Sequence, residues 1–569
     1  MKSASALVLG HGLGAFLQTI RSIGRHSIDV DVNRGSGHAM RSRFLREVVD
    51  FPDYREDAPE PWLAFVGELF RTKRYDFVLP CSDDVILPFV RHREFFRAFD
   101  FTQIAILSDT AFDVCSDKYR SAVLASESGL PVPEFYEHTV NDTLLDSIRA
   151  YAWEFPFIVK PRCSYVAGRR RTVKRIRHEE QLREFIARCA AWGSCIVQKN
   201  FNGTGIGVYL LAKAGRILAS MAQERLHEPL EGGGGYYRRS IPLPQELLPG
   251  IEQAVRSLNY TGVAMFEFKR NADDEWAFIE INGRLWGSLA LSMAAGCDFP
   301  YWLYQMLCEN REEFPQRYRT GIYSRNLSAD LHWTMDNLRA DRSDGTLATR
   351  PPLSVFAEAR HWIVGREYWD SFSWRDPGPF FGEVGELLGN GYGKFRRTLF
   401  PRWKGKRMKK AVLLKKFPEA RRVLVICYGN ILRSPFAAAY LREKLADRIE
   451  IREGGYLPNT DRPTPELAVQ VAATLDVDLT SHRSRSFSNE DLDWADMVIC
   501  FDEENYDHLR GRLGGNVDKI WPLGTVLPDK SPWIADPYGS DAEGFRKTYG
   551  TIQSCCDALI ASVEPLSGF

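Results

Sequence analysis

The sequence of 569 residues predicts an α/β protein of several domains, and three features along the chain support this prediction. The N-terminus reads as a strand at 6–10, a glycine-rich turn, a helix and a second strand at 27–32, which is typical of a parallel α/β sheet. From residue 113 onward, strands occur in pairs among helices, which indicates an α+β domain. A new strand at 423–426 follows a strongly basic segment and indicates a C-terminal α/β domain with a parallel sheet.

The composition is that of a globular protein. Apolar residues make up 44% of the chain and charged residues 26%, close to the averages of soluble proteins. No stretch approaches the about 18 apolar residues of a membrane span, and glycines interrupt the apolar N-terminus before it could serve as a signal peptide. We therefore expect a cytoplasmic protein. The 11 cysteines include no C-x-x-C pair, which argues against a disulfide framework or a zinc cluster.

The net charge of zero hides an uneven distribution. Residues 394–422 carry 13 basic residues and one acidic residue, a charge of +12, whereas residues 423–569 carry 14 basic and 23 acidic residues, a charge of −9. Such a basic segment could bind an anionic membrane or nucleic acid. Because no recognition motif accompanies the charge, we favour a solvated or partly helical linker and expect no nucleic-acid partner.

Changes of pattern divide the chain into five predicted segments. The first is the parallel α/β domain and the second is the α+β domain. The third is irregular and rich in tryptophan, the fourth is the basic linker, and the fifth is the C-terminal domain. In order, the predicted segments are 1–112, 113–310, 311–393, 394–420 and 421–569.

The C-terminal domain opens with a pattern that predicts a phosphate-binding loop. Its first strand runs into Cys427, and Arg433 follows six residues later at the start of a helical stretch. Backbone N–H groups at a helix N-terminus bind phosphate, and an arginine adds a bidentate contact. The same surroundings lower the pKa of a thiol, so Cys427 would be a nucleophilic thiolate. The alternative is a buried cysteine near an arginine by chance, and Gly429, Asn430 and Ser434 argue against it.

The loop resembles the signature C-x-G-N-x-C-R-S-P of the low-molecular-weight protein tyrosine phosphatases, with Leu432 in place of the second cysteine. The resemblance covers about residues 421–569. It implies a phosphotyrosine protein as the substrate, with Cys427 as the nucleophile and Arg433 as a catalytic residue. Because the second thiol of the family can protect the nucleophile as a disulfide, this chain should lack that protection.

The same resemblance implies the remaining residues of the site. The family takes the proton for the leaving phenolate from the aspartate of an Asp-Pro loop, and Asp536 in Asp-Pro-Tyr fits that role. An ordinary Asp-Pro turn is the alternative. The resemblance also implies that Asn430, Ser434 and His482 support the phosphate loop.

Two other activities occur on this fold. Thioredoxin-linked arsenate reductases relay through additional cysteines near the position of Asp502, and the nearby Cys500 is expected to point into the core. Protein-arginine phosphatases of the family tend to carry a threonine four residues after the nucleophile, where this chain has Ile431. The resemblance therefore favours phosphotyrosine over both arsenate and phosphoarginine.

A second group of residues, spread between 113 and 300, predicts a nucleotide site. Two acidic residues and an asparagine on neighbouring strands suit Mg²⁺, which takes few carboxylates and completes its octahedron with water and phosphate oxygens. Two earlier lysines could neutralise those phosphates. Alternatively, Lys160 caps a strand and Glu267 pairs with Lys269 or Arg270. The residues concerned are Glu267, Glu280, Asn282, Lys118 and Lys160.

In this order the motifs resemble the ATP-grasp superfamily, especially its carboxylate–amine ligase-like members, whose E-I-N-x-R-x-W-G-S run matches residues 280–288. The resemblance implies ATP and Mg²⁺ as cofactors and a small carboxylate and an amine as substrates. The implied roles are Lys118 and Lys160 on the ATP phosphates, Gln198 near the adenine, Glu267, Glu280 and Asn282 on magnesium, and Arg284 on the carboxylate or acyl phosphate.

The N-terminal turn admits two interpretations. Gly10-x-Gly12-x-x-Ala15 follows a strand, and Asp29 lies nineteen residues beyond Gly10, as in a dinucleotide-binding fingerprint. ATP-grasp proteins, however, commonly begin with a Rossmann-like domain that binds no dinucleotide and contributes to the substrate side of the cleft. The motifs that follow favour this second interpretation.

The two resemblances together predict a bifunctional enzyme. The first part of the chain would activate a carboxylate as an acyl phosphate for attack by an amine, and the last part would hydrolyse phosphotyrosine. The alternative is a regulatory phosphatase with a nucleotide-binding but non-ligating ATP-grasp module. The presence of Glu267, Glu280 and Asn282 together speaks against it.

Overall fold

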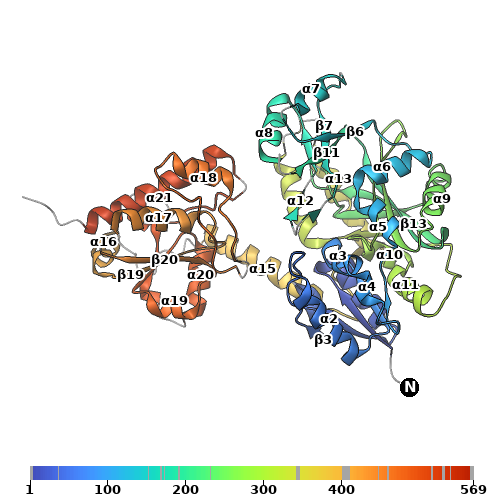
Figure 1. Ribbon diagram of the computed structural model, residues 1–569, viewed down its shortest axis with the longest axis horizontal. Helices are drawn as coiled ribbons and strands as arrows, with labels where there is room; N and C mark the ends of the chain where they lie inside the picture. Colours follow the sequence, from blue (N-terminus) through green and yellow to red (C-terminus); the bar gives the residue numbers. More distant parts are fainter. Residues whose placement is uncertain are drawn as a thin grey trace, which may run out of the picture. The chain divides into compact units, whose positions relative to one another are not determined.

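The computed structural model describes residues 4–563 apart from short gaps, and it divides into two compact units, Met1–Lys394 and Phe395–Phe569 (Figure 1). The division lies at the start of the predicted basic linker, of which residues 400–409 lie outside the described residues. The other gaps are 36, 142, 152, 164, 167–168, 172, 190–191, 231, 341, 343–346, 446–447, 458–459, 514–516, 528–531 and 539.

The first unit begins with a parallel sheet of strand order β3-β2-β1-β4-β5, which confirms the predicted Rossmann-like arrangement. Its central strand β1 is buried along its whole length, because helices cover both faces of the sheet. The strand order reverses between β1 and β4, so the loops that follow these two strands meet at the carboxyl edge. The elements are β1 (Ser5–Leu9), α1 (Leu17–Gly24), β2 (Asp29–Asn33), β3 (Leu45–Val49), α2 (Glu60–Lys73), β4 (Phe77–Pro80), α3 (Asp83–Arg91), α4 (Arg93–Phe96) and β5 (Gln103–Ile104).

Three further sheets follow in the same unit, one of them only the pair β8-β9, and they confirm the predicted α+β domain. A small antiparallel sheet has the order β10-β7-β11-β6, and a larger sheet has the order β16-β15-β12-β13-β14-β17-β18. The elements are α5 (Asp109–Ser116), α6 (Lys118–Glu127), β6 (Phe135–Thr139), α7 (Leu144–Arg149), β7 (Phe157–Pro161), β8 (Tyr165–Val166), β9 (Arg169–Arg170), β10 (Lys174–Ile176), α8 (Glu179–Cys189), β11 (Ser194–Lys199), β12 (Thr204–Lys213), β13 (Arg216–His227), β14 (Tyr237–Ile241), α9 (Leu248–Ser257), β15 (Gly262–Arg270), β16 (Trp276–Asn282), α10 (Leu289–Ala295) and α11 (Phe299–Cys308).

One hydrophobic core joins the large sheet to the Rossmann-like sheet. Tyr209 of β12 stacks on the buried Trp286 with ring centroids 4.1 Å apart, and both belong to the cluster that contains Phe16 and Leu79 of the Rossmann-like part. Because these side chains are shared, the loops at the carboxyl edge of the first sheet are held against the large sheet.

Residues 311–393 differ from the irregular segment that was predicted. Two short strands, β17 (Tyr323–Arg325) and β18 (Glu367–Trp369), extend the large sheet beyond β14, and helices α12 (Leu327–Arg339), α13 (Pro352–Ala357) and α14 (Ala359–Ile363) lie between them. The expectation of irregular structure is therefore wrong at these elements. Strands of three residues are too short to show the alternation of apolar and polar residues that identifies a strand.

A buried charged cluster fastens this segment to β13. The imidazole of His227 lies between the carboxylates of Asp330 and Glu358, at 2.7 and 3.1 Å, and stacks on the indole of Trp333. Arg325 pairs with Asp330 and with Glu367. Burial disfavours the charged imidazole, but the hydrogen bonds to the two carboxylates outweigh it and raise the pKa of His227.

The second unit is a separate α/β domain, and its parallel sheet β20-β19-β21-β22 confirms the prediction for the C-terminus. Figure 1 shows α17, α18 and α21 on one side of the sheet and α19 and α20 on the other, matching two hydrophobic clusters. Among the described helices of the chain, none is long and apolar enough to cross a bilayer. The elements are α16 (Lys410–Lys416), β19 (Arg422–Cys427), α17 (Arg433–Leu445), β20 (Glu450–Gly455), α18 (Glu466–Ala473), α19 (Asn489–Trp494), β21 (Met497–Cys500), α20 (Glu503–Arg512), β22 (Ile520–Pro522) and α21 (Ala542–Val563).

The His227 cluster predicts a pH dependence of stability. A raised folded-state pKa means that His227 stabilises the first unit fully below its unfolded-state pKa, and that this stabilisation is lost as pH rises through the folded-state pKa. We expect His227→Gln to remove this pH dependence and to cost about 1–3 kcal/mol at acidic pH. Calorimetric unfolding of the full chain across the pH range measures both effects. The control is His332→Gln on α12, an exposed histidine, and an unchanged pH dependence in His227→Gln would contradict the assignment.

Candidate active sites

The loop between β19 and α17 carries Cys427 at its beginning and Arg433 at its end. The Cys427 Sγ atom accepts a hydrogen bond from the backbone N–H of Asn430 at 3.2 Å and lies 3.0 Å from the hydroxyl oxygen of Ser434. The thiol is almost fully buried at the end of its strand, and α17 begins six residues later. Cys427 therefore lies where N–H groups and a helix N-terminus favour negative charge.

Asn430 holds the loop in shape. Its backbone has a positive φ of 49°, which asparagine tolerates better than most residues. Its amide nitrogen donates to the Ser434 hydroxyl at 3.0 Å, and its amide oxygen accepts from the backbone N–H of Arg485 at 2.8 Å. The backbone carbonyl of Asn430 lies 2.8 Å from Nε2 of His482, so this nitrogen carries the proton. The structure thus brings together all three residues that were predicted to support the loop.

Arg433 is enclosed by two carboxylates. Its guanidinium donates to Asp502 at 2.6 Å, to Asp536 at 2.5 Å and to the backbone carbonyl of Ile534 at 3.0 Å. Burial disfavours its charge, but the carboxylates, Asp536 above all, raise the pKa of Arg433. The expected proton donor Asp536 therefore lies beside the arginine that would hold the phosphate.

Asp502 was not predicted as a partner of Arg433. Its carboxylate also accepts a hydrogen bond from the backbone N–H of Asn505 at the start of α20, so it both caps that helix and pairs with the arginine. An aspartate directly before a helix is ordinary in sequence, which explains why the second role was missed. Cys500, two residues earlier, is buried in the apolar cluster on the other face of the sheet, as expected.

Two exposed tyrosines lie next to residues of this site in the sequence. Tyr428 directly follows Cys427, and Tyr538 lies two residues after Asp536. Both tyrosines are exposed. Ile431 is half-buried in the same loop, and Leu432 is buried. Flat exposed rings at these positions suit a planar substrate group.

In the first unit, three predicted residues meet at the edge of the large sheet. Glu267 on β15 is directly opposite Glu280 on β16. The amide nitrogen of Asn282 donates to both carboxylates, at 2.9 Å to Glu267 and 3.2 Å to Glu280. Two acidic side chains are therefore held within the reach of one amide group.

Lys118 at the start of α6 compensates this negative charge. Its ammonium lies 2.6 Å from the Glu280 carboxylate. Burial opposes ionisation of Glu280, but the charge and hydrogen bond of Lys118 prevail and lower its pKa to about 2. The pKa of Lys118 itself is raised by Glu280 against the effect of burial. Both groups are therefore charged at neutral pH.

Lys160 and Gln198 come from the small sheet. Lys160 of β7 is opposite Ile196 of β11, so Gln198, two residues further along β11, lies on the same face. The Lys160 ammonium donates to the backbone carbonyl of Ile279 at 3.3 Å, next to Glu280. Burial lowers the pKa of Lys160 to about 8. Both side chains are buried.

A cation that was not predicted, Arg225, also reaches the carboxylates. It lies on β13, two strands away from Glu267, and still donates to the Glu267 carboxylate at 2.6 Å. The intervening strand β12 has Gly205 at the crossing point, where a Cβ atom would come within 2.8 Å of the Arg225 side chain. A glycine inside a long apolar strand is the feature that could have indicated this close approach.

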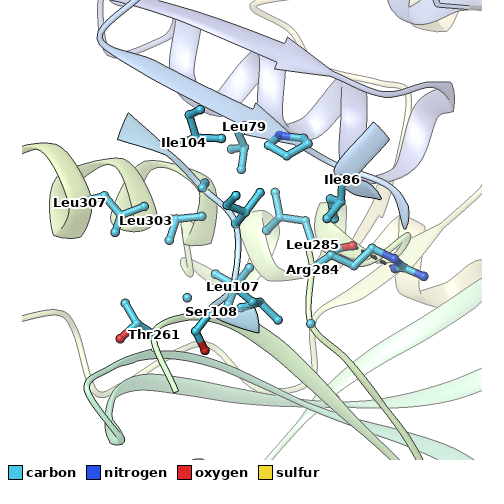
Figure 2. A pocket seen from close by; sticks show the side chains of 16 residues that line it. Leu79, Ile86, Ile104, Leu107, Ser108, Thr261, Arg284, Leu285, Leu303 and Leu307 are labelled. Atoms are coloured by element: carbon cyan, nitrogen blue, oxygen red, sulfur yellow. Dashed lines mark hydrogen bonds between the residues drawn. The ribbon is translucent and has the colours of Figure 1, made fainter. Parts of the chain in front are cut away.

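Arg284 connects the two parts of the first unit. Its guanidinium donates to the carboxylate of Asp83, which follows β4 of the Rossmann-like sheet, at 2.8 Å. Beside Arg284 lies a cavity of about 100 Å³ (Figure 2), and its walls are mostly apolar. Figure 2 shows Leu79, Leu107 and Leu303 around this cavity, with the Arg284 side chain leaving its wall.

The N-terminal glycine turn has a packing role. A Cβ atom at Gly14 would lie 2.8 Å from the backbone oxygen of Gly287, so the turn touches the loop that follows Asn282. Asp29, which a dinucleotide site would place near a ribose, pairs with Arg46 at 3.0 Å. These contacts favour the interpretation in which the glycines serve turn geometry and close packing.

The residues around Glu267 fit magnesium and nucleotide phosphates. Mg²⁺ prefers one or two carboxylates and takes its other oxygen ligands from water and phosphate. Glu267, Glu280 and Asn282 offer such a set, and Lys118 and Lys160 lie beside it. In the part of the chain that the structure describes, no group of three or more His, Cys, Asp or Glu side chains could hold a metal alone.

Comparison with known proteins identifies the second unit. A family model described as low molecular weight phosphotyrosine protein phosphatase matches residues 422–566. The low molecular weight phosphotyrosine protein phosphatase of Sus scrofa is 31% identical over 153 residues, which cover 25% of this chain and 95% of that protein. The chain belongs to the low molecular weight phosphotyrosine protein phosphatase family through its second unit. A protein-arginine-phosphatase of Geobacillus stearothermophilus is 27% identical over 143 residues, 25% of this chain and 96% of that protein.

The first unit matches a different family. A family model described as ATP-grasp in the biosynthetic pathway with Ter operon covers residues 193–328, which include Arg225, Glu267 and Asn282. Among solved structures, an L-amino acid ligase from Bacillus licheniformis is 16% identical with a TM-score of 0.44, over 57% of this chain and 79% of that one. The chain thus matches an ATP-grasp family model in its first unit and a low molecular weight phosphatase family model in its second.

The buried Lys160 predicts a pH dependence of nucleotide binding by the ATP-grasp unit. With its pKa lowered to about 8, the ammonium that would contact phosphate is lost as pH rises through this value. We expect the affinity for ADP with Mg²⁺ to fall by up to about tenfold per pH unit above it. Lys160→Arg should abolish this fall, because arginine stays charged. Titration calorimetry measures it, with Lys174→Arg as an exposed control, and a fall that Lys160→Arg leaves unchanged would refute the role of Lys160.

Proposed function

We propose that the chain is a bifunctional enzyme, a cysteine-dependent phosphotyrosine phosphatase joined to an ATP- and Mg²⁺-dependent carboxylate–amine ligase. The observation that carries this proposal is that each unit assembles a full set of polar groups for its own reaction. Cys427, Arg433 and Asp536 meet in the second unit, and Glu267, Glu280 and Lys118 meet in the first. Both reactions suit the cytoplasm, where thiols stay reduced and ATP is available.

The phosphatase reaction follows from the placement of three side chains. The Cys427 thiolate attacks phosphorus, the bond from phosphorus to the phenolic oxygen breaks, and Asp536 gives its proton to the leaving phenolate. Asp536 then takes a proton from water, whose oxygen attacks the phosphocysteine and releases phosphate and the thiolate. Arg433 and the loop N–H groups hold the phosphoryl oxygens in both steps. The contact between Arg433 and Asp536 supports this assignment, because it would keep the proposed proton donor near a phosphoryl group held by Arg433.

The phosphatase mechanism is tested by two substitutions. We expect Cys427→Ser to abolish hydrolysis of an aryl phosphate and to keep vanadate binding, since the loop N–H groups and Arg433 remain. Asp536→Asn should slow esters with poor leaving groups far more than those with good ones, because only the former need the proton. Steady-state kinetics over a series of aryl phosphates measures both effects. Equal losses across the series would exclude Asp536 as the acid, and substantial activity in Cys427→Ser would exclude the covalent step.

Ile431 is the residue on which we base the choice of phosphotyrosine over phosphoarginine. An apolar side chain at the loop offers van der Waals contact to a phenyl ring and no hydroxyl to a phosphoguanidinium or its attacking water. We expect phosphotyrosine peptides to give the higher kcat/KM, and Ile431→Thr to move the ratio toward phosphoarginine. Ile431→Val is the matched control, because valine has the shape of threonine without the hydroxyl. The reverse order in the native chain would overturn the proposed substrate.

The ligase proposal assigns each residue of the first unit a task. When bound together with Mg²⁺, ATP would supply the phosphoryl group that activates a carboxylate for displacement by an amine. The chain would bind these groups and orient the carboxylate, and its Asn282 amide would keep the two carboxylates in place. The proposed contacts are Lys118 and Lys160 with the phosphates, Gln198 near the adenine, Glu267, Glu280 and Asn282 with magnesium, and Arg284 with the carboxylate.

The cavity beside Arg284 supports an apolar side chain on that carboxylate. A cavity of 150 Å³ lined by Leu, Ile and Phe holds a benzene molecule, so the about 100 Å³ found here suits an aliphatic group of about four carbons. Its leucine and isoleucine walls would favour such a group over a charged one. Aliphatic amino acids and short aliphatic acids are therefore the first compounds to test.

The ligase activity is tested by ADP release from the purified full chain in the presence of carboxylates and amines. We expect Glu280→Gln to reduce substrate-dependent ADP release by at least about 100-fold, because a charged magnesium ligand is lost. Hydrolysis of aryl phosphates should be unchanged in this variant, and magnesium should be required only for ADP release. Glu275→Gln, an exposed glutamate near the start of β16, is the matched control. ADP release that persists in chelator would refute the metal site.

The competing function is a regulatory phosphatase whose ATP-grasp unit binds nucleotide without ligating. It predicts nucleotide binding by calorimetry together with no substrate-dependent ADP release from any carboxylate and amine pair. The ion pair between Lys118 and Glu280 and the contact of Asn282 with both carboxylates favour turnover, because a binding module has no need to keep a magnesium set intact.

A further inference from the structure

The first unit carries an exposed apolar patch that its own packing does not explain. The patch is formed by α13, α14, the loop after β18 and the start of α15 (Gly378–Leu399). Three of its side chains are among the most exposed large apolar residues described, with Trp374 at 89%, Leu353 at 83% and Ile363 at 74%. Large exposed apolar clusters on soluble units mark interaction sites. The apolar patch is defined by Leu353, Phe356, Ile363, Trp374, Phe381 and Leu388.

Contacts between aromatic rings show that one part of the patch is continuous. The Trp369 ring lies 5.5 Å from that of Phe380, which neighbours Phe381, and Phe372 lies 4.9 Å from Trp374. Phe372 and Phe380 are themselves 5.1 Å apart. The exposed Trp374 and Phe381 thus stand on a packed aromatic base, so their positions are fixed before any partner binds.

Within the segment 351–378, which carries four of the six patch residues, the exposed charges have one sign. In residues 351–378 the exposed charged side chains are three arginines, Arg360, Arg366 and Arg375. The four acidic side chains of this range are buried or paired inside the fold with cationic partners. These are Glu358 with His227, Glu367 with Arg325, Asp370 with Arg238 and Asp376 with Arg21. On α15, the exposed Glu386 pairs with His38.

The sequence that follows the patch adds more positive charge. Phe381 and Leu388 are seven residues apart on α15 and so share a face of that helix. Further along the sequence, residues 394–422 carry the charge of +12. Apolar and aromatic residues interleaved with Lys and Arg are typical of segments that lie on a membrane surface.

We propose that the apolar patch and its arginines bind the surface of an anionic lipid bilayer. The apolar side chains would enter the boundary between headgroups and acyl chains, where tryptophan is favoured, and the arginines would contact the anionic headgroups. A second copy of the chain fits less well, because two patches ringed by arginine repel each other. Nucleic acid would use the arginines, but it has no counterpart for Leu353 and Ile363.

Vesicle flotation of the full chain tests the proposal. We expect binding to vesicles of phosphatidylcholine with phosphatidylglycerol, weaker binding to phosphatidylcholine alone, and loss of binding at high salt. Each of Arg360→Gln and Arg375→Gln should lower the partition coefficient about fivefold. Trp374→Ser and Ile363→Ser should lower it on both vesicle types, whereas the control Val173→Ser, an exposed valine near the small sheet, should not. Circular dichroism and thermal unfolding of the first unit verify that each variant is folded.

Three outcomes would overturn the proposal. The first is no binding of the native chain to anionic vesicles at low salt. The second is binding that the patch variants leave unchanged, which would assign it to another surface. The third is a dimer in sedimentation, or a complex with an RNA probe, that Trp374→Ser abolishes while vesicle binding is absent. The dimer would assign the patch to a second copy of the chain, and the RNA complex would assign it to nucleic acid.

Discussion

The close approach of two carboxylates, Glu267 and Glu280, constrains much of the ATP-grasp unit. Like charges on directly opposite residues of neighbouring strands repel each other, so the pair is tolerable only with cations beside it. Lys118 reaches one carboxylate from the start of α6 and Arg225 reaches the other from β13. The helix must therefore dock on the sheet at that point, and β12 must carry a glycine where the arginine crosses it.

In the phosphatase unit the charges are arranged the other way round, with one buried cation between two carboxylates. There a single buried cation, Arg433, is held between two carboxylates, and its position relative to Cys427 is set by Asn430 and the start of α17. Asp536 comes from a loop and exposes part of its side chain, whereas Asp502 also caps a helix. The carboxylate proposed as the proton donor is thus the one that makes fewer structural contacts.

Sequence patterns predicted the parts of the protein in which chemistry and structure are local. Buried strands such as β1 and β19 are continuous apolar runs, and the loop from Cys427 to Ser434 carries its phosphate-binding groups within eight residues. The partners of Arg225, Arg284 and Arg433 were missed because they lie 42, 201 and 69 residues away along the chain. The strands β17 and β18 were missed because three residues show no period, and their place in the sheet depends on tertiary contacts around His227.

The addition of β17 and β18 to the large sheet has a practical consequence for dissecting the protein. A fragment that ended near residue 310 would leave β14 as an uncovered edge with free backbone donors and acceptors, which invites association with other chains. It would also leave His227 without its hydrogen-bond partners Asp330 and Glu358. A self-sufficient fragment of the first unit must therefore extend beyond Trp369, although the family match itself stops at residue 328.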